Sequence, residues 1–414
     1  MKKIQIHILL IVILSLSLKI GAGYFLGKNF SPTTWEYEAL AQNMLNKGEY
    51  SIDYREYGTY KALLAPGYSF LCFGVYKTFG VNHQLMLAMQ FALMTGFSII
   101  IYFIARQLFN DLNTAFIAGI LASLHPGLTY YSAAYLHNIN LYLPLFYLSI
   151  LFFCLSFNSK SYIPFIALGI SSGLAVLTRA TFAPVFLLGL ASYLLLSSKI
   201  DLRIRIRNAI IAFTFFFCLN LPWIIRNYNQ FDKFIFSQNN KWEAFWVGNN
   251  PNASGGHYHS NGTEVLSTKP PEMQAEINAN KNNEMAIEEV FKKYAMDYVR
   301  IQPIPFAKNL VRKSLYFWWF YPHTGMFYPR SFLIIYKFLY CLLVAFTAYG
   351  IYLCGKQKLW RNEFVFLVIL VFGIWSAHTV NFMEMRHRWT VEPVLIIFAS
   401  LGISAIAYDV LRIM

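Results

Sequence analysis

The sequence predicts an all-α polytopic membrane protein with about ten transmembrane helices. Three observations lead to this fold class. First, 57% of the 414 residues are hydrophobic and only 13% are charged, whereas a soluble globular chain carries about 25% charged residues. Second, successive apolar runs approach the roughly 20 residues that a helix needs to cross a bilayer. Third, basic residues gather in short segments between these runs. A disordered chain, a nucleic-acid-binding domain and an ordinary soluble enzyme are all disfavoured.

Seven of the predicted spans precede the longest polar stretch of the chain, and three follow it. In chain order the apolar runs cover residues 5–26, 84–108, 114–133, 139–157, 162–177, 182–198, 208–226, 330–354, 363–382 and 389–411. The fifth and sixth runs are short enough to form instead a hairpin that does not fully cross. Lys2 and Lys3 place the N terminus on the inner side, together with the basic loops at 199–207 and 356–361, as the positive-inside rule requires.

The first outer loop is predicted at residues 27–83. It should contain a helix over about 33–46 that ends at Gly48. We expect this helix to lie at the membrane interface, because its apolar residues share one face. A second apolar stretch, 69–79, follows and is too short to span the membrane.

The larger outer segment lies between spans seven and eight. Gly, Asn and Pro predict turns at 248–256, a charged helix is expected at about 272–300, and residues 304–320 should form an amphipathic helix returning to the membrane. The chain therefore divides into an N-terminal transmembrane module with the first outer loop, an extracytoplasmic loop region and C-terminal transmembrane helices. These parts are predicted at 1–226, 227–329 and 330–414.

Several familiar sequence motifs are absent. The chain has no phosphate-cradling GxxxxGK[ST], no GxGxxG, no HExxH and no GxSxG, so ATP-driven transport and soluble-type hydrolysis lack support. Acids within the spans are too scarce for a typical ion-coupled transporter. The five Cys lie in apolar runs without metal or disulfide spacing. No metal ligands and no cofactor are predicted, and the need for a divalent metal is left open.

Acids gather in the first outer loop. They are Glu36, Glu38, Glu49, Asp53 and Glu56. A carboxylate at a membrane–water boundary is partly desolvated, which raises its pKa and suits it to general-base catalysis. The alternative is a solvated helix face with no catalytic role.

Arginines are expected on the same outer side. Arg179 lies between two short spans, and Arg386 and Arg388 lie between the last two. Arg binds phosphate through two parallel hydrogen bonds, and positive charge on the outer side runs against the usual bias. A phosphate-bearing lipid is therefore one expectation, and structural pairing of Glu384 with Arg386 or Arg388 is the other.

Asn249 and Asn250 lie in a turn-rich stretch close to Trp242 and Trp246. Aromatic faces with amide side chains suit a sugar ring, which offers stacking surface and hydroxyl groups. A purely structural turn explains the same residues equally well.

Several stretches in a fixed order carry a family resemblance. They are Glu36-Tyr37 with Leu40 to Leu45 and Gly48; Ala65-Pro66-Gly67-Tyr68 to Phe79-Gly80; Ala105-Arg106-Gln107-Leu108-Phe109; His125-Pro126; Gly173 to Ala180; Arg226-Asn227-Tyr228; Gly248-Asn249-Asn250-Pro251 with Gly255; and Arg386-His387-Arg388-Trp389 before Glu392-Pro393. In these stretches the sequence resembles GT-C-fold glycosyltransferases of the protein O-mannosyltransferase and aminoarabinose transferase type, the bacterial family 39-like group.

The resemblance implies a sugar donor carried on polyprenyl phosphate and transfer on the outer face of a bacterial inner membrane. It also implies that an acid in the first outer loop acts as the base. Two positions depart from the family pattern, because Thr33 and Asn138 stand where acids are usual. Glu36, one helical turn after Thr33, could take over the role.

The sequence therefore predicts an inverting membrane glycosyltransferase that moves a sugar from a polyprenyl-phosphate carrier to a protein, lipid or glycan acceptor. Glu36 is the expected base, and Arg386, Arg388 and Arg179 are expected to bind the donor phosphate. The expected substrate-binding residues are Tyr37, Lys61, Asn138, Asn249 and Asn250. The alternatives are a catalytically silent homologue that binds a lipid-linked sugar, and a lipid-linked sugar flippase or transporter.

Overall fold

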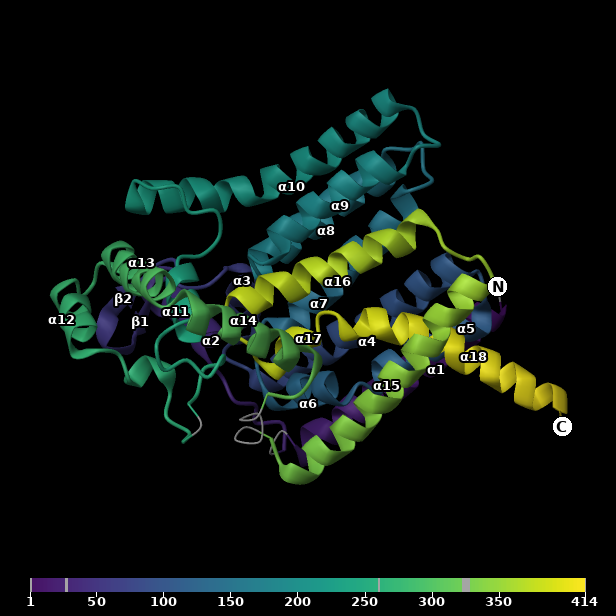
Figure 1. Cartoon of the computed structure of the whole chain (residues 1–414), viewed down its shortest axis with the longest axis horizontal. Helices are drawn as coiled ribbons and strands as arrows, with labels where there is room; N and C mark the ends of the chain where they lie inside the picture. Colours follow the sequence, from purple (N-terminus) through teal and green to yellow (C-terminus); the bar gives the residue numbers. More distant parts are fainter. Residues whose placement is uncertain (1, 27–28, 260, 322–327, 414) are drawn as a thin grey trace.

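The structure, a computed structural model, describes residues 2–26, 29–259, 261–321 and 328–413. It is a bundle of α-helices with one small β-hairpin (Figure 1). Seven helices in the described part are long and apolar enough to cross a membrane: α1 (Lys2–Phe25), α4 (His83–Phe109), α7 (Ile139–Ser156), α10 (Leu202–Phe231), α15 (Arg330–Lys356), α16 (Asn362–Val380) and α18 (Glu392–Ile413). Three shorter apolar helices join them: α5 (Leu112–Ser123), α8 (Ile163–Thr178) and α9 (Phe182–Leu196). Each overlaps a predicted run, and the predicted fold class is confirmed.

The third predicted span is interrupted. The apolar run 114–133 forms α5 and a second short helix, α6 (Pro126–Ala134), with a break at Leu124–His125. Pro126 has no N–H and clashes with a preceding helical turn, so it begins a helix more readily than it continues one. The His125 ring stabilises the new start, since its Nδ1 accepts a hydrogen bond from the Leu128 N–H at 3.1 Å.

The first outer loop contains more structure than predicted. Its helix α2 (Glu36–Lys47) begins three residues later than expected and ends at Gly48, whose φ of 70° is a left-handed cap. The hairpin β1 (Ile52–Tyr54) and β2 (Gly58–Tyr60) follows, with Ile52 opposite Tyr60, and then α3 (Gly67–Phe79). Strands of three residues are too short to leave a readable alternation in the sequence.

The second outer segment forms α11 (Lys241–Gly248), α12 (Pro271–Ala279), α13 (Glu284–Ile301) and the amphipathic helix α14 (Pro303–Trp318). The single charged helix expected at 272–300 is thus two helices. Asn282 adopts a left-handed φ of 67°, and the Asn283 side chain caps α13 by accepting from the Ala286 N–H. The prediction was wrong here because Asn satisfies helix ends with its side chain.

An outer lobe forms where α11, α12 and α13 pack on the β-hairpin. Its core includes Tyr57, Tyr60, Trp246 and Phe291. The lobe lies at one end of the molecule, and both chain termini lie toward the opposite end (Figure 1). The lobe and the two termini thus lie at opposite ends of the molecule, and which side of the membrane each faces stays a prediction.

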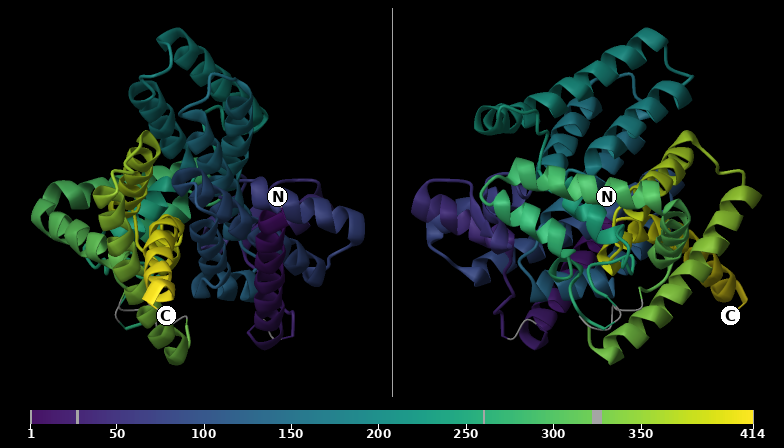
Figure 2. Two further views of the ribbon diagram at one scale, coloured as in Figure 1. Left: turned by 90° about the vertical axis from the view of Figure 1, so that its right-hand side faces the viewer. Right: turned by 60° about the vertical axis from the view of Figure 1, so that its left-hand side comes forward.

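Two groups of packed helices form opposite sides of the helical bundle. Helix α10 packs on the α8–α9 hairpin on one side, and α15 crosses α18 on the other (Figures 1 and 2). The α15–α18 crossing depends on glycine, since a Cβ added at Gly350 would lie 1.9 Å from the Phe398 carbonyl oxygen. Close backbone approach at small residues is the usual way in which helices associate in a membrane.

Three buried glutamates hold together α11, α13 and the first outer loop. Glu284 accepts hydrogen bonds from the backbone N–H groups of Lys61 and Ala62, Glu288 accepts from those at the start of α11, and Glu243 accepts from the Tyr54 hydroxyl at 2.8 Å. Burial, together with the charge of Glu288, raises the pKa of Glu243 to about 7. The ionised form of Glu243 is therefore disfavoured in the folded protein.

We expect Glu243→Gln to stabilise the protein above neutral pH. Below the usual carboxyl pKa of 4.5, Glu243 is protonated in both the folded and the unfolded chain. Between that value and about 7, only the folded chain keeps the proton, so stability falls as the pH rises. The neutral Gln avoids this loss of about 1–3 kcal/mol. Thermal unfolding at pH 5 and pH 8 should show a much larger gain at pH 8 than at pH 5, and an equal gain at both would contradict the titration.

Candidate functional site

Four segments that are distant in the sequence meet at the outer end of the bundle. They are the start of α2, the loop 135–138, the turn between α8 and α9, and the short helix α17 (Met385–Arg388). The Tyr37 hydroxyl lies close enough to Arg179, Arg386 and Glu36 for all three charges to act on it. The structure therefore brings the predicted base and two of the three predicted phosphate-binding arginines into one region.

Arg386 is held by groups from α6, from the loop 135–138 and from the residue that precedes α17. Its guanidinium donates to the Tyr131 hydroxyl at 2.9 Å, lies 3.2 Å from Nε2 of His137 and forms an ion pair with Glu384. Its carbon Cζ lies 6.0 Å from the centre of the Trp35 ring. Burial opposes the charge of Arg386, but Glu384 and Tyr131 raise its pKa above the usual value. Arg386 is thus a fixed cation, and the predicted pairing with Glu384 is also present.

Arg179 is the less engaged of the two cations. Its guanidinium lies 5.4 Å from the centre of the Tyr142 ring, and its side chain makes no hydrogen bond or ion pair with any residue that the structure describes. Arg179 and Arg386 repel each other across the site. The Arg179 guanidinium is half-buried beside a second cation, with the carboxylates of Glu36 and Glu384 in the same region, and its N–H donors suit an anion such as phosphate.

Glu36 differs from the other acids of the first outer loop. Glu38 is buried and contacts His83 and Tyr76, at 2.5 and 3.0 Å from its Oε1. Each of the remaining three has a partner: Glu49 pairs with Lys61, Asp53 accepts a hydrogen bond from Thr59, and Glu56 pairs with Lys269. Glu36 is half-buried and has no hydrogen bond or ion pair with the described residues. It alone of the five is a carboxylate without a competing partner in that part of the chain.

Aromatic rings surround the two arginines. Trp35 stacks on Tyr135 at 4.9 Å and meets the His137 ring edge-on at 5.3 Å, and Tyr37 also meets His137 edge-on. Burial, then Arg386 and Arg179, lower the pKa of His137 well below its usual value. His137 therefore stays neutral and leaves the positive charge to the arginines. His137 was not among the site residues expected from the sequence.

Thr33 and Asn138, the two positions where the resemblance implies acids, lie beside this cluster. Thr33 pairs with Tyr135 through backbone hydrogen bonds that run from Thr33 N to Ala134 O and from Leu136 N to Thr33 O. The Asn138 amide donates to the Thr178 carbonyl oxygen at 3.2 Å, next to Arg179. Both positions are thus part of the candidate site, although neither side chain can act as a general base.

Asn249 and Asn250 are structural. Asn249 is 0% exposed, and its amide donates to the carbonyl oxygens of Phe245 and Val380, while Asn250 caps its own turn through Trp246 and Asn252. The expected sugar contact at these amides is corrected, because their polar atoms are already used inside the protein. The structural-turn alternative describes them.

The turn at 248–256 instead supports the segment that carries Arg386. Lys313 of α14 is fully buried, and its ammonium group donates to Asn249 Oδ1 at 2.7 Å, Val380 O at 3.0 Å and Asn381 O at 2.5 Å. Burial lowers the pKa of Lys313 to about 7. Met383 N donates to Gly255 O at 2.8 Å in the same region. The loop, α14 and the approach to α17 are therefore fixed together.

Arg388 does not join Arg386. It is 1% exposed, its Nε donates to Glu392 Oε1 at 2.5 Å, and its guanidinium lies 4.0 Å from the centre of the Tyr340 ring. The prediction grouped the two arginines because they are neighbours in the sequence. Residues i and i+2 of a helix lie about 200° apart around its axis, so α17 points them to different sides.

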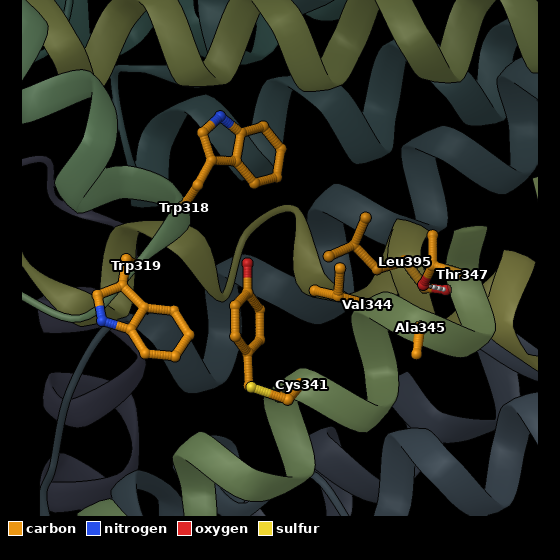
Figure 3. Close-up of a pocket in the computed structure, with 8 residues that line it drawn as sticks. Trp318, Trp319, Cys341, Val344, Ala345, Thr347 and Leu395 are labelled. Atoms are coloured by element: carbon orange, nitrogen blue, oxygen red, sulfur yellow. Dashed lines mark hydrogen bonds between the residues drawn. The ribbon is translucent and has the colours of Figure 1, made fainter.

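An apolar cavity of about 440 Å³ is lined by Tyr340 and by residues at the end of α14, in α15 and in α18 (Figure 3). Trp318 and Trp319, at the end of α14, face residues of α15 and α18 across it, and the Thr347 hydroxyl donates to the Leu395 carbonyl oxygen there at 3.0 Å. Since the cavity offers few polar groups, it suits hydrocarbon rather than a sugar or phosphate.

Lys61 lies at the edge of the outer lobe. Its ammonium group is 3.5 Å from Glu49, and its carbonyl oxygen accepts from Arg226 at 2.6 Å. The structure gives it no contact with Arg179 or Arg386. Its predicted role in substrate binding stays a prediction.

No group of three or more His, Cys, Asp or Glu side chains among the described residues could hold a metal ion.

Glu384 is a second carboxylate in the site, 3.7 Å from His257 and ion-paired with Arg386. The sequence singled it out only as a partner for arginine. Its place between Arg386 and His257 could not be predicted from the sequence, because these residues are brought together only by the fold.

The chain is similar to a known protein family and to solved structures. The family described as dolichyl-phosphate-mannose-protein mannosyltransferase matches residues 64–225, less than half of the chain. The crystal structure of ArnT from Cupriavidus metallidurans in the apo state is similar over 97% of this chain and 78% of that chain, with 14% sequence identity and a TM-score of 0.41. No curated protein matches. The family match confirms the predicted resemblance and supports a membrane glycosyltransferase of the GT-C type.

Proposed function

We propose that the protein transfers a sugar from a polyprenyl-phosphate carrier to an acceptor hydroxyl at the outer face of the membrane. The observation that carries the proposal is the pair Arg179 and Arg386 in one region with Glu36, whose carboxylate has no hydrogen bond or ion pair with the described residues. Two cations suit a phosphate leaving group, and a free carboxylate suits a base. The match to a mannosyltransferase family over residues 64–225 supports the same chemistry.

In the proposed reaction Glu36 takes the proton of the acceptor hydroxyl. The acceptor oxygen attacks the anomeric carbon, and the bond between that carbon and the phosphate oxygen breaks on the opposite face, so the configuration inverts. Negative charge develops on the departing polyprenyl phosphate, where Arg179 and Arg386 stabilise it. Fixed cations contribute most where charge develops during the reaction, because they need no reorganisation.

Native mass spectrometry of the gently purified protein tests the proposal directly. The protein is incubated with a polyprenyl-phosphate sugar, and acceptor lysate is then added. We expect bound sugar-lipid to become bare polyprenyl phosphate only after the acceptor is present. A bound lipid that keeps its sugar under all conditions would rule out a transferase.

Arg179→Gln should weaken donor binding by about tenfold to a hundredfold, since a hydrogen bond to a charged group contributes about 1.5–3 kcal/mol. The affinity for polyprenyl phosphate, measured by titration in detergent, checks this. Arg203→Gln is the matched control, because Arg203 is an exposed arginine at the start of α10, on the expected inner side. Equal losses in both variants would show a general charge effect instead of a phosphate site.

A catalytically silent homologue that binds the same lipid-linked sugar is the second candidate. It is favoured by Thr33 and Asn138, which occupy positions where the resemblance implies acids, and which make structural hydrogen bonds here. The two functions share the donor site and differ in whether Glu36 acts as a base. The mass-spectrometric experiment separates them, because a silent binder retains the intact donor.

A further inference from the structure

A second pocket lies at the opposite end of the bundle from the candidate site. It has a volume of about 420 Å³ and is formed by the end of α4, by α7 and by the residue that precedes α16. Helix α4 begins at His83, which contacts Glu38 of the outer loop, and it reaches this pocket about 40 Å away. The pocket is therefore remote from Arg179 and Arg386.

The polar part of the pocket carries two arginines. Arg106 and Arg361 line it with Gln107 and Asn110. Neither guanidinium has a hydrogen bond or ion pair with a residue in the described part of the chain. Two unpaired guanidinium groups at one pocket repel each other, and an anion between them would relieve this repulsion.

The nearest acids are already engaged. Glu363, two residues after Arg361, is buried and accepts a hydrogen bond from the Asn158 amide at 2.8 Å. Asp111, next to Asn110, caps α5 by accepting from the Thr114 N–H at 2.7 Å. Neither of these two carboxylates forms an ion pair with Arg106 or Arg361, so the guanidinium donors are not used by them.

The remainder of the pocket is apolar. Phe103, Leu151 and Leu155 line it, and Leu155 is 37% exposed on the surface of the bundle. The basic residues mark the end of α4 as the membrane boundary, with the apolar residues one to two helical turns deeper. Positive charge at the boundary and hydrocarbon below it match the two parts of a phospholipid.

We propose that this pocket binds an anionic phospholipid, with the headgroup phosphate between Arg106 and Arg361 and an acyl chain along Phe103, Leu151 and Leu155. Basic pockets between transmembrane helices are suited to anionic headgroups, because the guanidinium fork matches phosphate oxygens. The site is independent of sugar transfer and lies in the leaflet opposite to the candidate active site.

The test is lipid retention by the full-length protein. The protein is reconstituted in nanodiscs with equal amounts of phosphatidylglycerol and phosphatidylcholine, released, and the retained lipids are counted by native mass spectrometry. We expect the wild type to keep one phosphatidylglycerol. In the double variant Arg106→Gln with Arg361→Gln, the ratio of retained phosphatidylglycerol to phosphatidylcholine should fall by at least about tenfold. Lys199→Gln with Arg203→Gln removes the same charge from exposed residues at the same end and should retain the lipid.

Three results would overturn the proposal. One is equal loss in the two double variants, which would mean diffuse attraction to the surface. Another is displacement of the lipid by millimolar inorganic phosphate, which would mean a small-anion site. The third is unchanged retention in Arg361→Gln alone. This single variant changes an exposed side chain before α16, so it keeps the test decisive if the Arg106 change impairs folding.

Discussion

Glu36→Gln should lower the rate of sugar transfer by about a hundredfold to ten-thousandfold while leaving donor affinity nearly unchanged. Gln keeps the size and polarity of the side chain but cannot accept the proton of the acceptor hydroxyl, and a positioned base contributes a factor of this order. Because Glu36 has no hydrogen bond or ion pair with the described residues, its replacement should not disturb the fold. The expected result is thus a loss of kcat without a loss of donor binding or thermal stability.

Two further variants make this result specific. Asp53→Asn changes an exposed acid of the same loop, which contacts Thr59 within the hairpin, and should retain activity. Glu384→Gln removes the other carboxylate of the site and the partner of Arg386. If Glu36→Gln remained active and Glu384→Gln did not, the base would be Glu384 and the assignment of Glu36 would be wrong.

The sequence was sufficient to predict the spans, and the reason is physical. A membrane helix must satisfy its backbone within itself and present apolar side chains over about 20 residues, so the run lengths carry the signal. The prediction failed where a short polar feature interrupts a run. Pro126 broke the third span, and Asn282 and Asn283 divided the charged helix of the outer lobe.

The candidate site was predictable in part. Charge bias and topology indicated that Glu36, Arg179 and Arg386 lie on one side of the membrane, although they are far apart in the chain. Sequence could not show which polar atoms are free. Asn249 and Asn250 use their amides on nearby carbonyl oxygens, and this depends on the packing of the turn against Lys313 and the end of α16.

Arg388 and Glu392 belong to a buried polar network. From the sequence, Arg388 was expected to bind the donor phosphate together with Arg386. The Glu392 carboxylate accepts from Arg388 Nε at 2.5 Å, lies 2.6 Å from His125 Nε2 and accepts from the Tyr336 hydroxyl at 2.8 Å. Since His125 Nδ1 accepts from the Leu128 N–H, the ring proton lies on Nε2 and points to Glu392. The network joins α15, α17, α18 and the break before α6.

Arg388→Met should therefore destabilise the protein by about 3–5 kcal/mol, because it leaves the Glu392 charge buried without its cation. Thermal unfolding in mild detergent should show a midpoint lower by several degrees. Adding Glu392→Gln to the variant should restore much of the loss, since the pair then contains no unbalanced charge. If Arg388 bound the donor phosphate instead, Arg388→Met would weaken donor binding with little effect on unfolding, and Glu392→Gln would not compensate. The 1% exposure of both side chains and their direct contact favour the structural outcome.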